Sequence, residues 1–313
     1  MKTKTGIVTA LCAIFFFCSC GKKDESILRL GYLQSDLHHL PAFVALDKGF
    51  FAEQGLTVQV GGVFRAGPEE MSAFGAGELD FGYVGQAPAT AAYFNGVADI
   101  QFIALVNREG SAIVTRSDGT LTSVKNLAGK TVAIPGHATM QDFLLRRALH
   151  NSGMNFQDIR PIVLKPPEML QALEQKNIDA YIAWQPYPAL ALTTQSARVL
   201  MDSSDIWNDH PCCVLIAQRS LCTRQPGSIK KIHAAHEKAC DFIAAHPDEA
   251  IAIAMKYTSM DRSVLVEALR HIKYTGGLDK TMSREFVDFL KNQNYIKNTA
   301  YTDERFLNMF FNE

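Results

Sequence analysis

The sequence predicts an α/β protein built from two successive units, and three observations support this fold class. Short runs of β-forming residues alternate with segments of helical periodicity from residue 27 to about residue 220. The alternation restarts near Ser111, and the chain becomes mostly helical after Ser228. This alternation of strands and helices is typical of a mostly parallel sheet covered by helices. A chain of 313 residues is long enough to form two units with separate cores.

The first unit is expected to contain four strands and three helices. The strand runs are rich in aliphatic and aromatic residues, and each helix begins at a proline. Gly55 is expected to end the first helix region. The strands are expected at 27–32, 56–60, 79–84 and 100–106, and the helices at 41–53, 68–76 and 88–94.

The second unit repeats the pattern. Thr139 with Asp142 three residues later is typical of a helix N-cap, and Gly153 fits the end of the same helix. One more strand is expected after His210–Pro211, before the helical C-terminal part. The strands are expected at 112–115, 130–134, 161–164, 180–184 and 212–218, and the helices at 140–151 and 167–176.

The first twenty residues indicate export. Lys2 and Lys4 precede an apolar run over 7–17, which is shorter than the roughly 20 residues of a membrane span. The run ends in Phe-Cys-Ser-Cys-Gly and resembles a bacterial lipobox, with Phe17 where Leu is more usual. We expect a signal peptide over 1–19, a lipid on Cys20 and a polar tether over 20–26. An ordinary signal peptide with an incidental cysteine is the alternative.

Composition excludes one class of partner. Removal of residues 1–19 takes away Lys2 and Lys4 but no acid, so the formal net charge moves from −1 to −3. No basic excess exists to neutralise a phosphate backbone, so we expect no nucleic-acid partner. Four cysteines follow Cys20, and they fit disulfides in an exported protein or small buried apolar side chains equally well. They are Cys212, Cys213, Cys222 and Cys240.

Four segments carry a resemblance to a known family. Residues 39–56 combine a proline, a small apolar helix, Lys-Gly-Phe-Phe and Glu-x-Gly-Leu directly after the first strand. Together with 77–85, 127–136 and 179–187, this segment resembles the solute-binding proteins of nitrate/sulfonate/taurine-type ABC importers, which are related to thiamine-pyrimidine-binding proteins. Gln185 stands where this family often has Glu, so ligand contacts there would be neutral.

The resemblance implies a two-lobed periplasmic-binding-protein type II fold with a ligand cleft between the lobes. Lobe I is expected to comprise 27–110 and 211–313, and lobe II 111–210. The resemblance also implies that the chain binds a small-molecule solute without transforming it. A membrane permease and its ATPase, made by other chains, would receive the solute. We expect a monomer without cofactor or metal, lipid-anchored at the extracytoplasmic face of a bacterial membrane.

The candidate ligand contacts lie where strands lead into helices. Ligands of open α/β sheets bind at the carboxyl ends of strands, and helix N-termini suit anions. For the third and fourth junctions, the resemblance implies that they face the cleft. Each candidate also has a purely structural explanation. This is helix capping at the first and fourth junctions, a solvated loop arginine at the second, a tight turn at the third, and core packing for the two aromatic residues. The candidates are Ser35 and His38 in the first junction, Arg65 and Gly67 in the second, Gln86 and Ala87 in the third, His137 and Thr139 in the fourth, and Trp184 and Tyr187 as cleft walls.

Arg65 is the expected partner of an anionic group, and the two aromatic residues would cover the apolar part of the solute. The solute is therefore expected to be a small anion of the sulfonate, nitrate and taurine class. If so, Arg65→Ala should weaken its binding by about one to two decades. A thiamine-precursor pyrimidine is the alternative ligand. A lipoprotein sensor or scaffold is a further alternative. An enzyme resembling a thiamine-pyrimidine synthase is disfavoured, because the sequence carries only two adjacent cysteines and no recognisable catalytic motif.

Cys20→Ala is expected to leave an unlipidated precursor or to release the protein from membranes, because it removes the atom that carries the lipid. Detergent partitioning and the mass of the membrane-bound protein measure this. Unchanged mass and membrane retention would contradict the lipid anchor.

Overall fold

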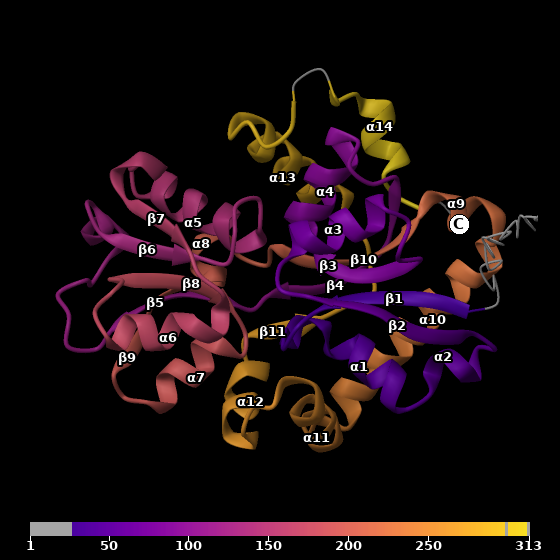
Figure 1. Cartoon of the computed structure of the whole chain (residues 1–313), viewed down its shortest axis with the longest axis horizontal. Coiled ribbons are helices and arrows are strands. Elements are labelled where there is room, and N and C mark those ends of the chain that lie inside the picture. Colours follow the sequence, from indigo (N-terminus) through magenta and orange to yellow (C-terminus); the bar gives the residue numbers. More distant parts are fainter. Residues whose placement is uncertain (1–26, 298–299, 312–313) are drawn as a thin grey trace, which may run out of the picture.

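The computed structural model describes residues 27–297 and 300–311, so the expected signal peptide, Cys20 and the tether lie outside the described residues. The described residues form two α/β bodies side by side, each built around one sheet (Figure 1). The predicted α/β class with two sheets is confirmed. Within the described ranges, no helix combines the length and apolar character that a bilayer crossing requires.

The first sheet has six strands in the order β11-β4-β10-β3-β1-β2. Strand β1 pairs in parallel with β2 and β3, whereas β10 lies antiparallel between β3 and β4. The strands are β1 (Ile27–Leu33), β2 (Thr57–Phe64), β3 (Phe81–Gly85), β4 (Ile100–Glu109), β10 (Pro211–Gln218) and β11 (Ile272–Tyr274).

The second sheet has five strands in the order β7-β6-β8-β5-β9 and repeats the same plan. Strand β6 pairs in parallel with β7 and β8, and β5 lies antiparallel between β8 and β9. Each sheet is therefore mixed, although four of its strands run in one direction, as the expectation of a mostly parallel sheet requires. The sheets are mixed because the strand by which the chain enters from the other sheet, β5 or β10, runs opposite to its neighbours. The strands are β5 (Ser111–Arg116), β6 (Thr131–Ile134), β7 (Arg160–Val163), β8 (Ala180–Trp184) and β9 (Ala197–Asp202).

Helices cover both sheets, and most begin where the sequence places them. The helix expected at 41–53 is divided at Gly49, whose φ of 75° interrupts the helical backbone. The helices are α1 (Leu40–Asp47), α2 (Phe50–Glu53), α3 (Gly67–Gly75), α4 (Gln86–Asn95), α5 (Met140–Asn151), α6 (Pro166–Glu174), α7 (Tyr187–Thr193), α8 (Ser203–Ile206), α9 (Arg219–Arg224), α10 (Pro226–Ala245), α11 (Pro247–Thr258), α12 (Arg262–Leu269), α13 (Lys280–Asn292) and α14 (Asp303–Asn308).

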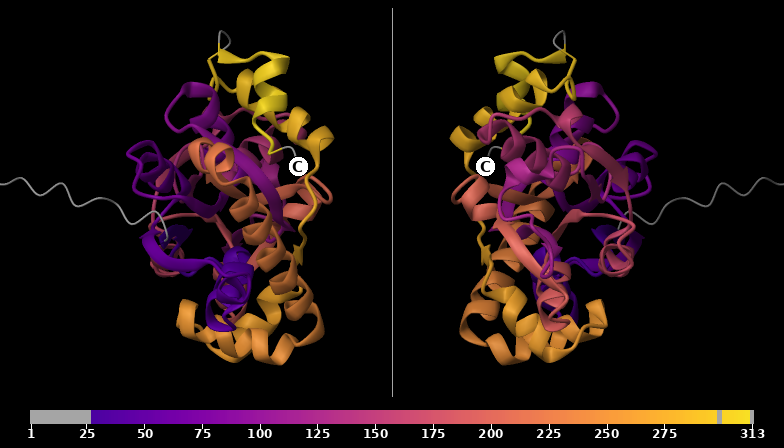
Figure 2. Two further views of the ribbon diagram at one scale, coloured as in Figure 1. Left: turned by 90° about the vertical axis from the view of Figure 1, so that its right-hand side faces the viewer. Right: turned by 90° about the vertical axis from the view of Figure 1, so that its left-hand side faces the viewer.

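The C-terminal helices contact both bodies at two opposite edges. Helices α11 and α12 lie at the lower edge and α13 and α14 at the upper edge (Figures 1 and 2). At the lower edge, α12 packs against α7. At the upper edge, the ring of Phe143 on α5 lies 4.3 Å from that of Phe286 and 4.6 Å from that of Phe289, both on α13. The exact borders of the two expected lobes stay a prediction, and α13 contacts elements of both.

A buried glutamate lies beside the first sheet. Glu70 on α3 is fully buried, and neither of its carboxyl oxygens has a hydrogen-bond partner among the described residues. A Cβ atom added at Gly31 or Gly82 would lie 2.8 Å or 2.6 Å from Oε1, so glycine at both positions allows the carboxyl group to approach the strands. Burial raises the pKa of Glu70 well above its usual value. The folded state therefore favours the neutral form of this side chain more strongly than the unfolded state does.

Glu70→Gln is expected to remove one source of pH-dependent stability. The stabilisation from a raised folded pKa is fully present below the unfolded pKa, near 4.5, and is lost as pH rises towards the folded pKa. Relative to the variant, the unfolding free energy of the wild type should fall by about 1.4 kcal/mol per pH unit above roughly pH 5. Denaturant unfolding at several pH values measures this difference. Glu69→Gln, on the exposed side of α3, is the matched control. Parallel curves for wild type and Glu70→Gln would contradict a neutral Glu70.

Candidate functional site

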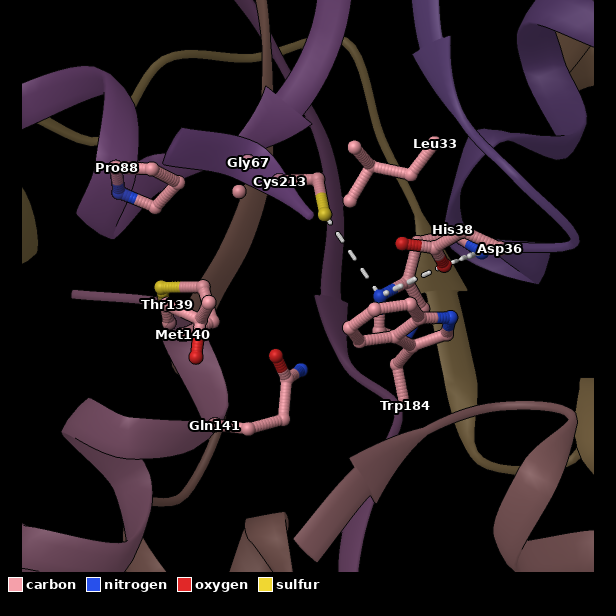
Figure 3. A pocket seen from close by; sticks show the side chains of 11 residues that line it. Leu33, Asp36, His38, Gly67, Pro88, Thr139, Met140, Gln141, Trp184 and Cys213 are labelled. Carbon is pink, nitrogen blue, oxygen red and sulfur yellow. Dashed lines mark hydrogen bonds and ion pairs between the residues drawn. The ribbon is translucent and has the colours of Figure 1, made fainter. Parts of the chain in front are cut away.

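A small cavity lies between the two bodies, where strands of both sheets lead into helices (Figure 3). Its free space is about 10 Å³, close to the least that holds one water molecule. None of the eleven lining residues, all of them described, is a lysine or an arginine. The lining residues are Leu33, Asp36, His38, Gly67, Gly85, Pro88 and Cys213 from the first body, and Thr139, Met140, Gln141 and Trp184 from the second.

The turn after β1 places an acid and a histidine at the cavity. The Asp36 carboxylate accepts a hydrogen bond from the backbone N–H of His38 at 2.9 Å and so caps the short 3-10 helix Leu37–His39. On the opposite side, Nε2 of His38 lies 2.8 Å from the carbonyl oxygen of Gly110. Because a carbonyl oxygen only accepts, Nε2 carries a hydrogen atom. The other ring nitrogen, Nδ1, lies 3.4 Å from Asp36 Oδ1.

Two adjacent cysteines approach the same histidine. Nδ1 of His38 lies 3.6 Å from Cys212 Sγ and 3.7 Å from Cys213 Sγ, and the two sulfur atoms are 3.9 Å apart. Neighbouring side chains of a regular strand point to opposite faces of the sheet. The pairing of β10 with β4 shifts register on both sides of Cys213, which is where a bulge can change that alternation. Both thiols are buried and free.

The buried charges in this cluster shift one another. Burial raises the pKa of Asp36 to about 7. Burial by itself lowers the pKa of His38, but the negative charges of Cys212 and Asp36 outweigh it and raise that pKa to about 9. A hydrogen bond from Cys213 lowers the pKa of Cys212 well below its usual value, against the effect of burial. Burial raises the pKa of Cys213 well above its usual value. The positive charge of the imidazole and the negative charge of the cysteine pair therefore favour each other in this cluster.

Three helices begin at the cavity. Gly67 opens α3, Pro88 lies in the first turn of α4, and Thr139 caps α5 by accepting a hydrogen bond from the Asp142 N–H at 3.2 Å. The cap that the sequence predicts at Thr139 is thus present. The N–H of Ala87 in α4 points at Met140 Sδ, 3.3 Å away. A sulfur atom is a weak acceptor, so this N–H is available to a stronger one.

Aromatic side chains from the second body form one wall. Trp184 is 2% exposed, and its indole N–H has no partner among the described residues. Its ring meets that of Tyr187 edge to face, with centroids 6.2 Å apart. Burial raises the pKa of Tyr187 to about 12, and the Ser35 hydroxyl is hydrogen-bonded to this side chain. Trp184 thus offers an unpaired donor as well as a flat apolar surface.

Comparison with known proteins assigns the family. Residues 21–258, about three quarters of the chain, match the model of the NMT1-like family. The chain belongs to this family. It is 26% identical to a candidate aliphatic sulfonates-binding protein of Escherichia coli, over 84% of this chain and 82% of that one. It is also 26% identical to the taurine-binding periplasmic protein of E. coli, over 66% of this chain and 64% of that one.

A solved structure shares the fold. The crystal structure of the periplasmic aliphatic sulphonate binding protein SsuA from E. coli matches with a TM-score of 0.78 and 23% sequence identity. The match covers 92% of this chain and 99% of SsuA. The periplasmic-binding-protein fold expected for this NMT1-like chain is therefore confirmed.

Four of the predicted site residues line the cavity of this NMT1-like protein, and three others lie close to it. Ala87 contacts Met140 of the lining, Tyr187 lies beside Trp184, and the Ser35 hydroxyl is hydrogen-bonded to Tyr187. The four lining residues are His38, Gly67, Thr139 and Trp184.

The remaining three predicted residues lie away from the cavity lining. The Arg65 side chain is exposed, and its backbone N–H donates to Glu69. His137 is also exposed, with Nδ1 at 3.9 Å from an Asp142 oxygen. The Gln86 amide donates to Ser283 on α13 at 2.9 Å. A ligand role for any of these three stays a prediction.

Sequence reasoning did not nominate four polar or sulfur-containing lining residues. Asp36 lies between two nominated residues, and Met140 and Gln141 directly follow Thr139, so a search of the whole junction would have found them. Cys213 gave no local signal, because strand alternation predicts that it points away from Cys212.

Gly67→Ala is expected to destabilise the protein by about 1–3 kcal/mol, because the added Cβ would lie 2.3 Å from Pro88 Cγ and force α3 away from α4. Gly227→Ala in α10 is the matched control. No atom lies within 4 Å of its added Cβ, so this change should be neutral or stabilise by up to about 1 kcal/mol. Urea unfolding of both variants measures the difference. Unchanged stability of Gly67→Ala would show that α3 and α4 do not make this contact.

Proposed function

We propose that this NMT1-like protein is the extracytoplasmic solute-binding component of an ABC importer. It captures a small anionic solute of the sulfonate, taurine and nitrate class and passes it on unchanged. The observation that carries the proposal is the convergence of three helix N-termini, from both bodies, on one cavity. Unpaired N–H groups and the positive end of each helix dipole favour an anion at such a point.

The relatives support the solute class. The E. coli proteins named above are a candidate aliphatic sulfonates-binding protein and a taurine-binding protein, and both are similar to this chain over most of its length. The Trp184 wall suits the organic part of such a solute, and its unpaired indole N–H can donate to an anionic oxygen.

Capture requires movement of the two bodies. The cavity has space for about one water molecule, which is less than any sulfonate needs. In the proposal, the bodies separate to admit the solute and then close on it, as hinged α/β binding proteins do. The contacts of α12 and α13 with the second body would hold the closed form.

The proposal includes the location and the partners expected from the sequence. The chain would be exported, held at the membrane by a lipid on Cys20, and would work as a monomer with a permease and an ATPase. The negative formal charge and the polar segment 21–26 fit a soluble domain tethered to a bilayer surface.

Isothermal calorimetry with taurine, an alkanesulfonate and nitrate tests the ligand class. Trp184→Ala should weaken the bound solute by tenfold or more, since it removes a wall of the cavity. Arg65→Ala should weaken it by no more than about fivefold, because exposed charges contribute roughly 0–1 kcal/mol. A loss of one to two decades in Arg65→Ala would instead place this arginine on the solute in the closed form. Absence of binding for all three anions would contradict the proposed class.

A further inference from the structure

The buried cluster of Asp36, His38, Cys212 and Cys213 lies at the start of β10. It has no role in the proposed capture of an anion. It combines two thiols, an imidazole and a carboxylate, which are all side chains that bind metal ions. Among the described residues, two groups of three potential ligands lie close enough to share a metal ion: His38 with Cys212 and Cys213, and Asp36 with His39 and Cys213. The thiols are 0% and 2% exposed and His38 is 1% exposed.

The three soft donor atoms form a triangle of the right size for one metal ion. Its sides are 3.6 Å and 3.7 Å from His38 Nδ1 to the two sulfur atoms, and 3.9 Å between the sulfur atoms. A tetrahedral Zn²⁺ ion with Zn–S near 2.3 Å and Zn–N near 2.0 Å separates its ligand atoms by about 3.5–3.8 Å. The triangle therefore matches one face of a tetrahedral site to within a few tenths of an ångström.

The surroundings hold the ligands in this arrangement. Nε2 of His38 donates to the Gly110 carbonyl, which turns Nδ1 towards the thiols and is the usual outer contact of a metal-binding histidine. Gly110 has a φ of 90°, and a Cβ atom added there would lie 2.3 Å from His38 Nε2, so only glycine allows this contact. The Asp36 carboxylate lies beside the same histidine, with Oδ1 3.4 Å from Nδ1 (Figure 3).

We propose that His38, Cys212 and Cys213 bind one thiophilic metal ion, such as Zn²⁺. Two thiolates and one imidazole are donors that Zn²⁺ accepts in tetrahedral geometry, which leaves the fourth position for a further ligand such as water. The ion would lie at the edge of the cavity, since His38 and Cys213 both line it. The site does not depend on the proposed solute, and either proposal can fail alone. It also replaces the expectation from sequence that no metal is bound.

A second cysteine–histidine pair in the same chain provides an internal control. Cys240 Sγ lies 3.6 Å from His236 Nε2, almost the separation found at His38. That ring nitrogen faces the carbonyl oxygens of Leu105 and Thr275, which require a hydrogen atom on it. The pair therefore has the same residue types and spacing but no free nitrogen and no second thiol.

The test is metal binding by the full chain in its reduced, metal-stripped state. Zn²⁺ affinity is measured by competition with a chromophoric chelator. Co²⁺ serves as a spectroscopic probe, because thiolate-to-cobalt charge transfer and intense visible bands identify tetrahedral sulfur coordination. We expect one Zn²⁺ per chain and a Co²⁺ spectrum that shows two thiolates. Cys213→Ser should weaken Zn²⁺ by at least about 100-fold, since even the loss of an outer contact costs 10–100-fold.

The controls make the result decisive. Cys240→Ser and Cys222→Ser, each at a buried or half-buried thiol outside the cluster, should leave Zn²⁺ affinity and the Co²⁺ spectrum unchanged. If Cys213→Ser does not fold, Cys212→Ser and the Co²⁺ spectrum of the wild type still identify the ligands. The proposal is overturned if the reduced wild type binds no stoichiometric Zn²⁺. It is also overturned if the Co²⁺ spectrum lacks thiolate bands, or if Cys240→Ser abolishes binding as Cys213→Ser does.

Discussion

The first sheet depends on the antiparallel pairing of β10 with both of its neighbours. Strands β3 and β4 do not pair with each other, and β10 provides the hydrogen bonds between them along residues 211–218. The entire second body lies between β4 and β10 in the chain. The first sheet therefore cannot be completed until about a hundred residues have been spanned, and a compact second body lowers the entropic cost of that closure.

The same topology brings the cavity residues together. Residue 110, at the single-residue passage from β4 to β5, accepts hydrogen bonds at its carbonyl oxygen from His38 Nε2 at 2.8 Å and from the Gln185 N–H at 2.9 Å. His38 belongs to the first body and Gln185 follows the last residue of β8 in the second. One peptide group thus anchors the cavity wall to both bodies. Strand β10 then returns beside it and places the two cysteines against the histidine.

The sequence predicts an element well where its hydrophobic periodicity agrees with the capping and turn residues at its ends. Residues 140–151 and 180–184 are examples, and they match α5 and β8. It misses β9, a half-buried edge strand, and the three-residue β11, because neither has a clear apolar pattern. It cannot show that β5 and β10 run against their neighbours, since strand direction is a property of the assembled sheet. For the cavity, junction residues such as His38 and Gly67 were predictable from topology. The meeting of Cys213 with His38 was not, because it requires a local register shift and a contact across 175 positions of sequence.

The small size of the cavity has a consequence for any affinity measured in solution. A protein that must first adopt an open form binds with its intrinsic affinity multiplied by the fraction of molecules in that form, so an open population of about 1% weakens apparent binding about a hundredfold. In the proposed opening of the two bodies, the aromatic contact between α5 and α13 lies outside the cavity, yet its strength would set part of that fraction. Natural variation at this distant edge could therefore adjust how readily the protein loads at a given solute concentration, while the chemistry that selects the solute stays the same.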